Sequence, residues 1–298
     1  MPDDPRAMSR AMPWVFVLIW STGFVVARYA MPHAPPLSFL SVRYVLSIAA
    51  FGVWIVIARP AWPRDRAQWG HLAASGVMMH AGYLGGVWAA VKSGIGAGTV
   101  ALLVGLQPVL TAIWLSARSS RDGASRVTGQ QWAGLLLGLV GLALVVWRKL
   151  GIGEVTPFNL ACALLALLSI TAGTLYQKRH VRPVDVRTGS LVQLGAALLV
   201  TLPLALLEPQ AVQWHPDLVI ALVWSVLALS LGASSLLMLL IQAGAATRVT
   251  SLFYLVPPCT AVLAWLLFDE RLGLSAAGGM ALCAIGVALV LRGERKPA

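Results

Sequence analysis

Apolar runs of about 18 or more residues, separated by short polar breaks, fill nearly all of this chain of 298 residues. A run of that length is typical of a helix that crosses a bilayer, because a helix satisfies its own backbone polar groups. Ten candidate spans cover approximately residues 12–30, 37–58, 70–91, 96–116, 131–147, 157–177, 188–207, 217–242, 247–268 and 274–291. We therefore expect an all-α polytopic protein of ten transmembrane helices, forming one membrane domain over 1–298.

The composition agrees with a membrane protein. Only 11% of the residues are charged, whereas a soluble domain carries roughly 25%. The net charge of +11 would suggest nucleic acid in a soluble protein, but here the basic residues lie in short connections, where they can contact anionic lipid. We expect the bilayer, and no nucleic acid, as a partner. Cys162, Cys259 and Cys283 lie within apolar runs and form no CxxC motif, so neither a disulfide framework nor a metal site is predicted.

The basic residues also orient the chain. With ten spans both termini face one side, and 16 of the 22 Lys and Arg residues then lie on that side, against five on the other. Arg43 alone remains inside a span. Cytoplasmic loops carry the excess of Lys and Arg. The sequence therefore predicts a multi-pass protein of a bacterial inner membrane with both termini in the cytoplasm.

An internal repeat divides the chain. The pattern Pro-x-x-Thr-Ala at Pro108 recurs at Pro257, 149 residues later, and Gly141-Leu-Ala-Leu-Val corresponds to Gly286-Val-Ala-Leu-Val. Weaker matches join the first span to the sixth and the third to the eighth. We expect repeat one at about 12–147 and repeat two at about 157–291. Because each half holds an odd number of spans, the repeats are inverted, an arrangement typical of secondary transporters with a substrate site near the midplane.

Two short motifs carry a resemblance to a known family. Ile19-Trp20-Ser21-Thr22-Gly23-Phe24 in the first span and Phe268-Asp269-Glu270-Arg271-Leu272 after the ninth are similar to recurring motifs of the drug/metabolite transporter superfamily, EamA-type branch. The first half has Ser116-Ala117-Arg118-Ser119 in place of the acidic segment, which therefore occurs once and is given no transport role. His80 and Tyr83 make the chain look most like the YddG-type exporters of aromatic and other neutral amino acids.

The acidic residues limit the substrate. All eleven lie outside the predicted spans or at their ends. Proton-coupled exporters of cationic drugs usually hold a carboxylate within the membrane, where it can exchange a proton for the drug. The absence of such a group from the predicted spans favours a neutral or zwitterionic substrate.

Several residues are candidates for substrate binding. Arg43 must face a polar cavity or a partner, and the repeat aligns it with Gln193; it is either a structural pin or a substrate contact. His80 and Tyr83 share one helix face and are predicted to line the central cavity, although a lone membrane histidine can also be a packing residue. The remaining candidates, chosen as aromatic walls, hydroxyls or amides, are Trp20, Ser21, Thr22, Phe24, Gln107, Tyr176, Phe253 and Tyr254.

Backbone features add hinges and close contacts. Pro108 and the pair Pro257-Pro258 interrupt the fourth and ninth spans at corresponding positions, and proline frees a carbonyl that can line a cavity. They are the predicted hinges. Gly82-x-x-x-Gly86 permits close approach of another helix.

The function expected is export of small neutral metabolites, most of all aromatic or neutral amino acids, by alternating access. Another metabolite class remains an alternative, as does a channel-like facilitator. A phosphorylated sugar would require more cavity cations than Arg43. No GxSxG, HExxH or Walker motif is present, so we predict neither an enzyme nor a cofactor. No obligate protein partner is evident.

Overall fold

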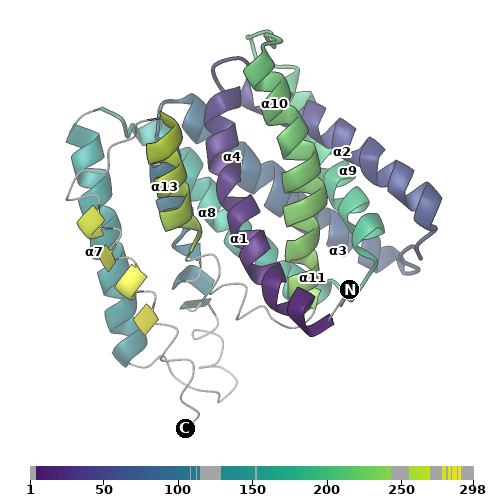
Figure 1. Cartoon of the computed structure of the whole chain (residues 1–298), viewed down its shortest axis with the longest axis horizontal. Helices are drawn as coiled ribbons and strands as arrows, with labels where there is room; N and C mark the ends of the chain where they lie inside the picture. Colours follow the sequence, from purple (N-terminus) through teal and green to yellow (C-terminus); the bar gives the residue numbers. More distant parts are fainter. Residues whose placement is uncertain are drawn as a thin grey trace.

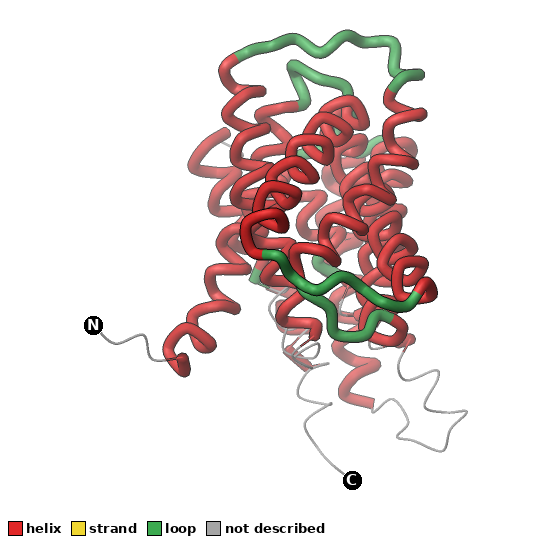
Figure 2. The backbone as a smooth tube through the Cα atoms, turned by 90° about the vertical axis from the view of Figure 1, so that its right-hand side faces the viewer, coloured by secondary structure: helices red, strands yellow, loops and turns green. Residues whose placement is uncertain are grey.

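The computed structural model describes residues 5–107, 109–111, 113–114, 129–151, 153–242, 255–268, 277–279, 281–282, 284–286 and 288–289. Within these ranges the regular elements are helices, and Figure 2 shows no strand among them. The helices run roughly along one direction, with the connecting loops gathered at the two ends of the bundle (Figure 2).

The described residues of the first half form the following helices, one of which is a joined series of three. They are α1 (Pro5–Ala30), α2 (Pro36–Ala58), the joined series α3 (Arg66–Gly76), η1 (Val77–Gly82) and α4 (Tyr83–Lys92), α5 (Ala97–Val104) and α7 (Gly129–Gly151). The second half contains α8 (Pro157–His180), α9 (Val186–Ala205), the joined series α10 (Pro216–Trp224), η2 (Ser225–Ser234) and α11 (Ser235–Gln242), and α13 (Val256–Phe268). The segments η1 and η2 are π-helical.

Four described helical segments are long and apolar enough to cross a membrane: Pro36–Ala58, Pro157–His180, Val186–Ala205 and Pro216–Gln242. Shorter apolar helices include Trp14–Ala30 and Val256–Phe268. The described part of the protein is therefore all-helical, and several of its helices are suited to cross a bilayer. The described helix bounds agree with the predicted spans to within a few residues, with two exceptions. Helix α1 begins at Pro5 rather than 12, and α5 ends at Val104, whereas the fourth span was predicted to continue to 116. The predicted tenth span, 274–291, is only partly described. Residues 247–254 of the predicted ninth span lie outside the described part.

The helices form one bundle. In Figure 1, α7 and α13 lie at one side and α2 at the other, with α1 between them. The most extensive helix contacts among the described elements are those of α2 with α9, α4 with α8, and α3 with α9. Apolar side chains fill the interior, and Phe24, Tyr44 and Trp88 are almost completely buried there.

The repeat in sequence is a repeat in structure. The third helix, Arg66–Lys92, and the eighth, Pro216–Gln242, begin and end 150 residues apart. Each contains a π-helical section in its middle, and π-helical segments are rare and frequently found at functional sites. The contacts repeat as well, because α1 packs against η2 as α8 packs against η1.

Small residues bring α4 and α8 together. A Cβ atom on Gly86 would lie 2.6 Å from the Cys162 carbonyl oxygen and 3.0 Å from the Ala166 Cβ. A Cβ on Gly82 would lie 2.6 Å from the Ser169 hydroxyl oxygen. The close approach predicted for Gly82-x-x-x-Gly86 is confirmed.

Helix breaks occur beside the predicted prolines. In the first half α5 ends at Val104, and Gly105 and Leu106 form a turn before helix resumes at Gln107. Pro257 and Pro258 lie in the first turn of α13, where proline needs no backbone partner. A Cβ on Gly105 would lie 2.5 Å from the Pro257 ring, so the two breaks are in direct contact. Pro108 lies outside the described residues.

Candidate substrate-binding site

A narrow pocket lies between the two repeats. Its volume is about 30 Å³, and it lies between side chains of α1, α2, η1 and α4 from repeat one and of η2 from repeat two. Its lining is mainly aromatic and apolar, with a few polar groups. The residues that define it are Trp20, Phe24, Arg43, His80, Tyr83, Trp88, Leu229 and Ser234.

Arg43 supplies the positive charge of this pocket. It lies two turns into α2 and its side chain is only 3% exposed. Its Nε donates a hydrogen bond of 3.0 Å to the Ser230 hydroxyl in η2. No acidic side chain of the described residues lies within ion-pair distance of it. A buried guanidinium in a membrane is costly without an anionic partner, so the pocket favours a ligand that carries a negative group.

Aromatic rings form the wall beside Arg43. Trp20 in α1 and Tyr83 in α4 are stacked, with ring centroids 6.1 Å apart and planes only 4° from parallel. Trp88 is stacked in turn on Phe39, at 4.4 Å. Phe24 is buried at the same pocket. These flat apolar surfaces are suited to an aromatic or aliphatic side chain of a ligand.

His80 is positioned by the π-helical segment. The Tyr44 hydroxyl donates a hydrogen bond of 2.9 Å to the His80 backbone carbonyl in η1. The His80 imidazole lies beside the Gln193 amide in α9. Both His80 and Tyr83 line the pocket, so the face that they share points into it.

Gln193 lies beside the pocket but not among its lining residues. Its amide nitrogen donates to the Ser75 hydroxyl at 2.9 Å and to the Gln177 amide oxygen at 3.0 Å. The cluster joins α9 and α8 of repeat two to α3 of repeat one. Gln193 thus connects the helices beside His80, whereas Arg43, its equivalent in repeat one, lines the pocket itself.

Ser21 and Thr22 are not among the lining residues of the pocket, and their hydroxyls bond to the backbone of α1. The Ser21 hydroxyl donates to the Val17 carbonyl at 2.7 Å, and that of Thr22 donates to the Ile19 carbonyl at 2.6 Å. Thr22 also accepts a hydrogen bond of 2.8 Å from the Trp224 indole. Such bonds to the preceding turn are common for hydroxyl side chains in apolar helices.

The other sequence candidates are dispersed. Gln107 donates to the Thr174 hydroxyl at 3.1 Å, and its buried amide oxygen has no hydrogen-bond partner among the described residues. Tyr176 lies near the end of α8, bonded to His71 at 2.9 Å and stacked on His180 at 4.4 Å, in a different cavity. Phe253 and Tyr254 lie outside the described residues.

Sequence reasoning missed Ser230, Ser234 and Trp88. The repeat could have indicated Ser230, because this residue lies 150 positions after His80 and is therefore its counterpart in repeat two. Trp88 resembled the many interfacial tryptophans, and only its burial against Phe39 distinguishes it.

The EamA-like transporter family model matches this chain twice, over residues 12–147 and 158–292. The chain is similar to an uncharacterized transporter, YvbV, of Bacillus subtilis (24% identity over 97% of this chain and 93% of the relative). A probable amino-acid metabolite efflux pump of Salmonella typhimurium is 25% identical over 55% of this chain and 51% of its own.

A third relative is an uncharacterized inner membrane transporter of Escherichia coli, YedA, 23% identical over 61% of this chain and 57% of its own. One solved crystal structure superimposes on 98% of this chain and 100% of its own with a TM-score of 0.68, at 19% identity, which shows a shared fold. With two matched segments that together span most of its length, this chain belongs to the EamA-like transporter family and is a membrane transporter.

Proposed function

We propose that this transporter exports zwitterionic amino acids, above all aromatic and neutral ones, across the bacterial inner membrane by alternating access. The observation that carries the proposal is Arg43: a buried guanidinium without an acidic partner among the described residues, beside the stacked rings of Trp20 and Tyr83.

The substrate carboxylate binds Arg43 in this scheme. A guanidinium presents several N–H donors in one plane, which matches the two oxygens of a carboxylate. The pairing replaces the water that Arg43 loses on burial. The same interaction would not form with an amine that lacks a carboxylate, so the pocket distinguishes amino acids from cationic drugs.

The substrate side chain packs against the aromatic wall. Trp20 and Tyr83 offer a flat apolar surface, and an aromatic contact of this kind adds about 0.5–1.5 kcal/mol to simple burial. His80 and Ser234 supply neutral polar groups for the substrate ammonium. Arg43 is the only charged side chain among the described lining residues, which favours substrates whose own side chain is uncharged.

The repeats supply the mechanism. We infer ten spans in two inverted five-helix repeats, about 12–147 and 157–291, with both termini in the cytoplasm. The π-helical segments at matching places, η1 and η2, both contribute to the pocket, and rocking of one repeat against the other would open it to each side in turn. The helix breaks at Gly105 and Pro257, which touch each other, are the proposed hinges, together with Pro108 and Pro258.

Two observations support this substrate class over the alternatives. A relative at 25% identity over about half of each chain is described as a probable amino-acid metabolite efflux pump. A phosphorylated metabolite would require several cations, whereas the described lining residues include Arg43 alone. The partners implied are the small-molecule substrate and the bilayer.

Reconstitution tests the proposal. Pure protein in liposomes is loaded with unlabelled phenylalanine, and uptake of labelled phenylalanine, leucine and tyrosine is measured with and without a pH gradient. We expect saturable exchange of all three, competed by each other and absent from protein-free liposomes. Flux that rises linearly with concentration would indicate a channel instead. If no amino acid moves under either condition, the substrate assignment is wrong.

A further inference from the structure

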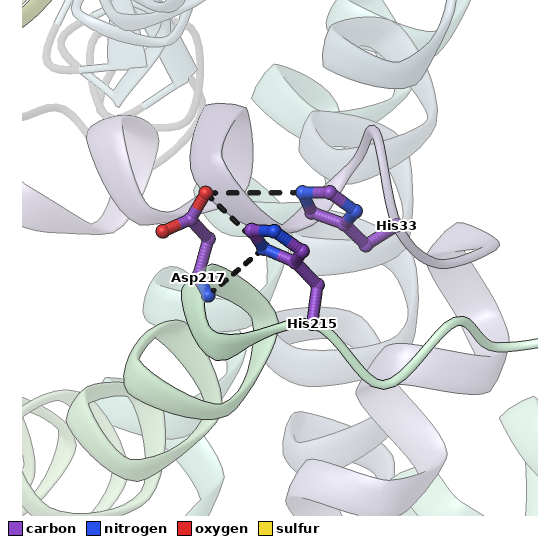
Figure 3. Close-up of side chains that lie close together, drawn as sticks. All are labelled: His33, His215 and Asp217. Atoms are coloured by element: carbon purple, nitrogen blue, oxygen red, sulfur yellow. Dashed lines mark hydrogen bonds and ion pairs between the residues drawn. The ribbon is translucent and has the colours of Figure 1, made fainter.

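A second cluster of polar side chains lies at one end of the bundle, where α2 and α10 begin. His33 is in the turn between α1 and α2, His215 precedes α10, and Asp217 is in the first turn of α10 (Figure 3). The cluster therefore combines one residue of repeat one with two residues of repeat two. None of these residues touches the pocket around Arg43.

The three side chains point toward one another (Figure 3). The Asp217 Oδ2 atom lies 3.3 Å from His215 Nδ1 and 3.9 Å from His33 Nε2. The two imidazole rings are stacked, with centroids 4.3 Å apart and planes 8° from parallel. One ligand atom from each residue lies within 4.8 Å of the other two.

These separations are close to those of a metal centre. Tetrahedral Zn²⁺ with bonds of about 2.0–2.1 Å holds its ligand atoms about 3.3 Å apart. The Asp217–His215 separation is already 3.3 Å. The remaining separations, at most 4.8 Å, must close by about 1.5 Å or less to reach this spacing.

Backbone hydrogen bonds hold the two loops in register. The Gln213 N–H donates to the His33 carbonyl at 2.8 Å. The Glu208 carboxylate accepts from the backbone N–H of Leu37 and Ser38, at 3.0 and 2.8 Å. These contacts hold the two loops together without the three side chains, as a preorganised ligand set requires. The His215 Nδ1 atom also caps α10 by accepting a hydrogen bond of 3.3 Å from the Asp217 N–H, and an ion bound at Nδ1 would replace that bond.

From this geometry we propose that His33, His215 and Asp217 bind one divalent transition-metal ion of the zinc class, with water completing the coordination. Two imidazoles and one carboxylate suit Zn²⁺, Ni²⁺ or Cu²⁺, whereas Mg²⁺ and Ca²⁺ prefer oxygen ligands. The side chains are 21%, 50% and 48% exposed, respectively, so an ion can reach them from solution.

A bound ion would join the two repeats. It would tie the α1–α2 turn to the start of α10, beside the hydrogen bond between Gln213 and His33. If transport requires the repeats to separate at this end, which rests on the proposed function, zinc slows transport by holding that end closed.

Binding is tested on the tag-free full-length protein in detergent, by calorimetry with Zn²⁺ and by the visible absorption of Co²⁺. We expect one ion per chain. His33→Ala, His215→Ala and Asp217→Ala should each weaken binding by about tenfold or more, because even the loss of an outer-shell partner has effects of 10–100-fold.

The matched control is the double variant His71→Ala/His180→Ala. These imidazoles also lie near each other, with centroids 5.3 Å apart, but away from the cluster: His180 lines a different cavity, and His71 is bonded to Tyr176 of that cavity. The control should bind Zn²⁺ as the natural protein does. The proposal is overturned if the natural protein binds no Zn²⁺. It is also overturned if the double variant His33→Ala/His215→Ala retains full Zn²⁺ affinity while gel filtration and tryptophan fluorescence show that it is folded.

The transport consequence has its own readout. Zn²⁺ should slow phenylalanine exchange by the natural protein and leave His33→Ala/His215→Ala unaffected. Equal exchange rates with and without Zn²⁺ in both proteins would show that a bound ion does not restrain the two repeats. The calorimetry separately decides whether the ion binds at His33, His215 and Asp217. Because binding is measured without any substrate, a failure of the amino-acid assignment is distinguishable from a failure of the metal site.

Discussion

Arg43 in α2 is hydrogen-bonded to Ser230 in η2, across the boundary between the two repeats, with 3.0 Å between donor and acceptor. The repeat aligns Arg43 with Gln193 and Ser230 with His80, each 150 residues apart, and the side chains of Gln193 and His80 also lie next to each other. The two contacts are related by the repeat, but only one of them carries a charge. If the proposed zwitterionic substrate binds in the pocket, its carboxylate should therefore face Arg43 of repeat one.

Replacing Arg43 by glutamine, the residue at its repeat partner, should remove carboxylate recognition. Charge-assisted hydrogen bonds contribute about 1.5–3 kcal/mol, so phenylalanine affinity should fall about 10- to 100-fold. Phenethylamine, which lacks the carboxylate, serves as the comparison ligand. Competition assays in proteoliposomes should show that the natural protein prefers phenylalanine strongly and that Arg43→Gln does not. An unchanged preference would mean that Arg43 is a structural pin.

The stacked pair Trp20 and Tyr83 should set the preference for aromatic substrates. Trp20→Leu or Tyr83→Leu should weaken phenylalanine competition about three- to tenfold, the equivalent of 0.5–1.5 kcal/mol, with a smaller effect on leucine. Trp147→Leu is the control, since Trp147 is 81% exposed on α7. A parallel loss for both amino acids would point to general damage rather than to ring recognition.

Gly86 should be intolerant of any side chain. In Gly86→Ala the new Cβ would meet the Cys162 carbonyl oxygen at 2.6 Å, so α4 and α8 must separate, at a cost of about 1–3 kcal/mol. Gly52→Ala is the matched control, because a Cβ at Gly52 meets nothing within 4 Å. Thermal denaturation in detergent should show a lower Tm for the first variant only. Equal melting of both would contradict the close helix contact.

Asp185, outside the spans, should contribute a pH-dependent part of the stability. It caps the start of α9, and its hydrogen bond from the Arg187 guanidinium lowers the pKa of its carboxyl below the usual value. Because the folded pKa is the lower one, the stabilisation is present above the unfolded value of about 3.9 and is lost as the pH falls through the folded pKa. The Tm difference between the natural protein and Asp185→Ala should therefore shrink in strong acid. A difference that is constant with pH would contradict this.

The helices were predictable where their ends are chemically marked. Pro36, Pro157 and Pro216 each start a helix, and proline is favoured in the first turn. The repeat was readable because Pro108 and Pro257 begin the same pattern. The count of ten spans stays a prediction, as does the orientation of the termini.

The site was only partly predictable, because its partners come from distant segments. One pocket is lined by five of the predicted residues: Trp20, Phe24, Arg43, His80 and Tyr83. The helix face shared by His80 and Tyr83 and the intramembrane charge of Arg43 were the signals in the sequence. Ser21 and Thr22 were chosen for their hydroxyls, but helix backbone carbonyls take those hydrogen bonds.

Contacts between distant residues left little trace in the sequence. The π-helical segments lie where the two repeats are in contact, η1 against α8 and η2 against α1, and no local motif predicted them. His33 and His215 are 182 residues apart, so nothing in the spacing indicated that their rings would be stacked.

The most direct test asks whether substrate occupies the pocket between the repeats. In a variant with Cys162, Cys259 and Cys283 replaced by alanine, Ser234→Cys places a thiol in the pocket lining, and Thr22→Cys places one outside it. The rate of thiol alkylation is measured with and without phenylalanine. The account predicts that saturating phenylalanine slows alkylation at position 234 and not at position 22, and that phenethylamine protects neither. Equal alkylation of Ser234→Cys with and without phenylalanine, in protein that still transports it, would contradict the account.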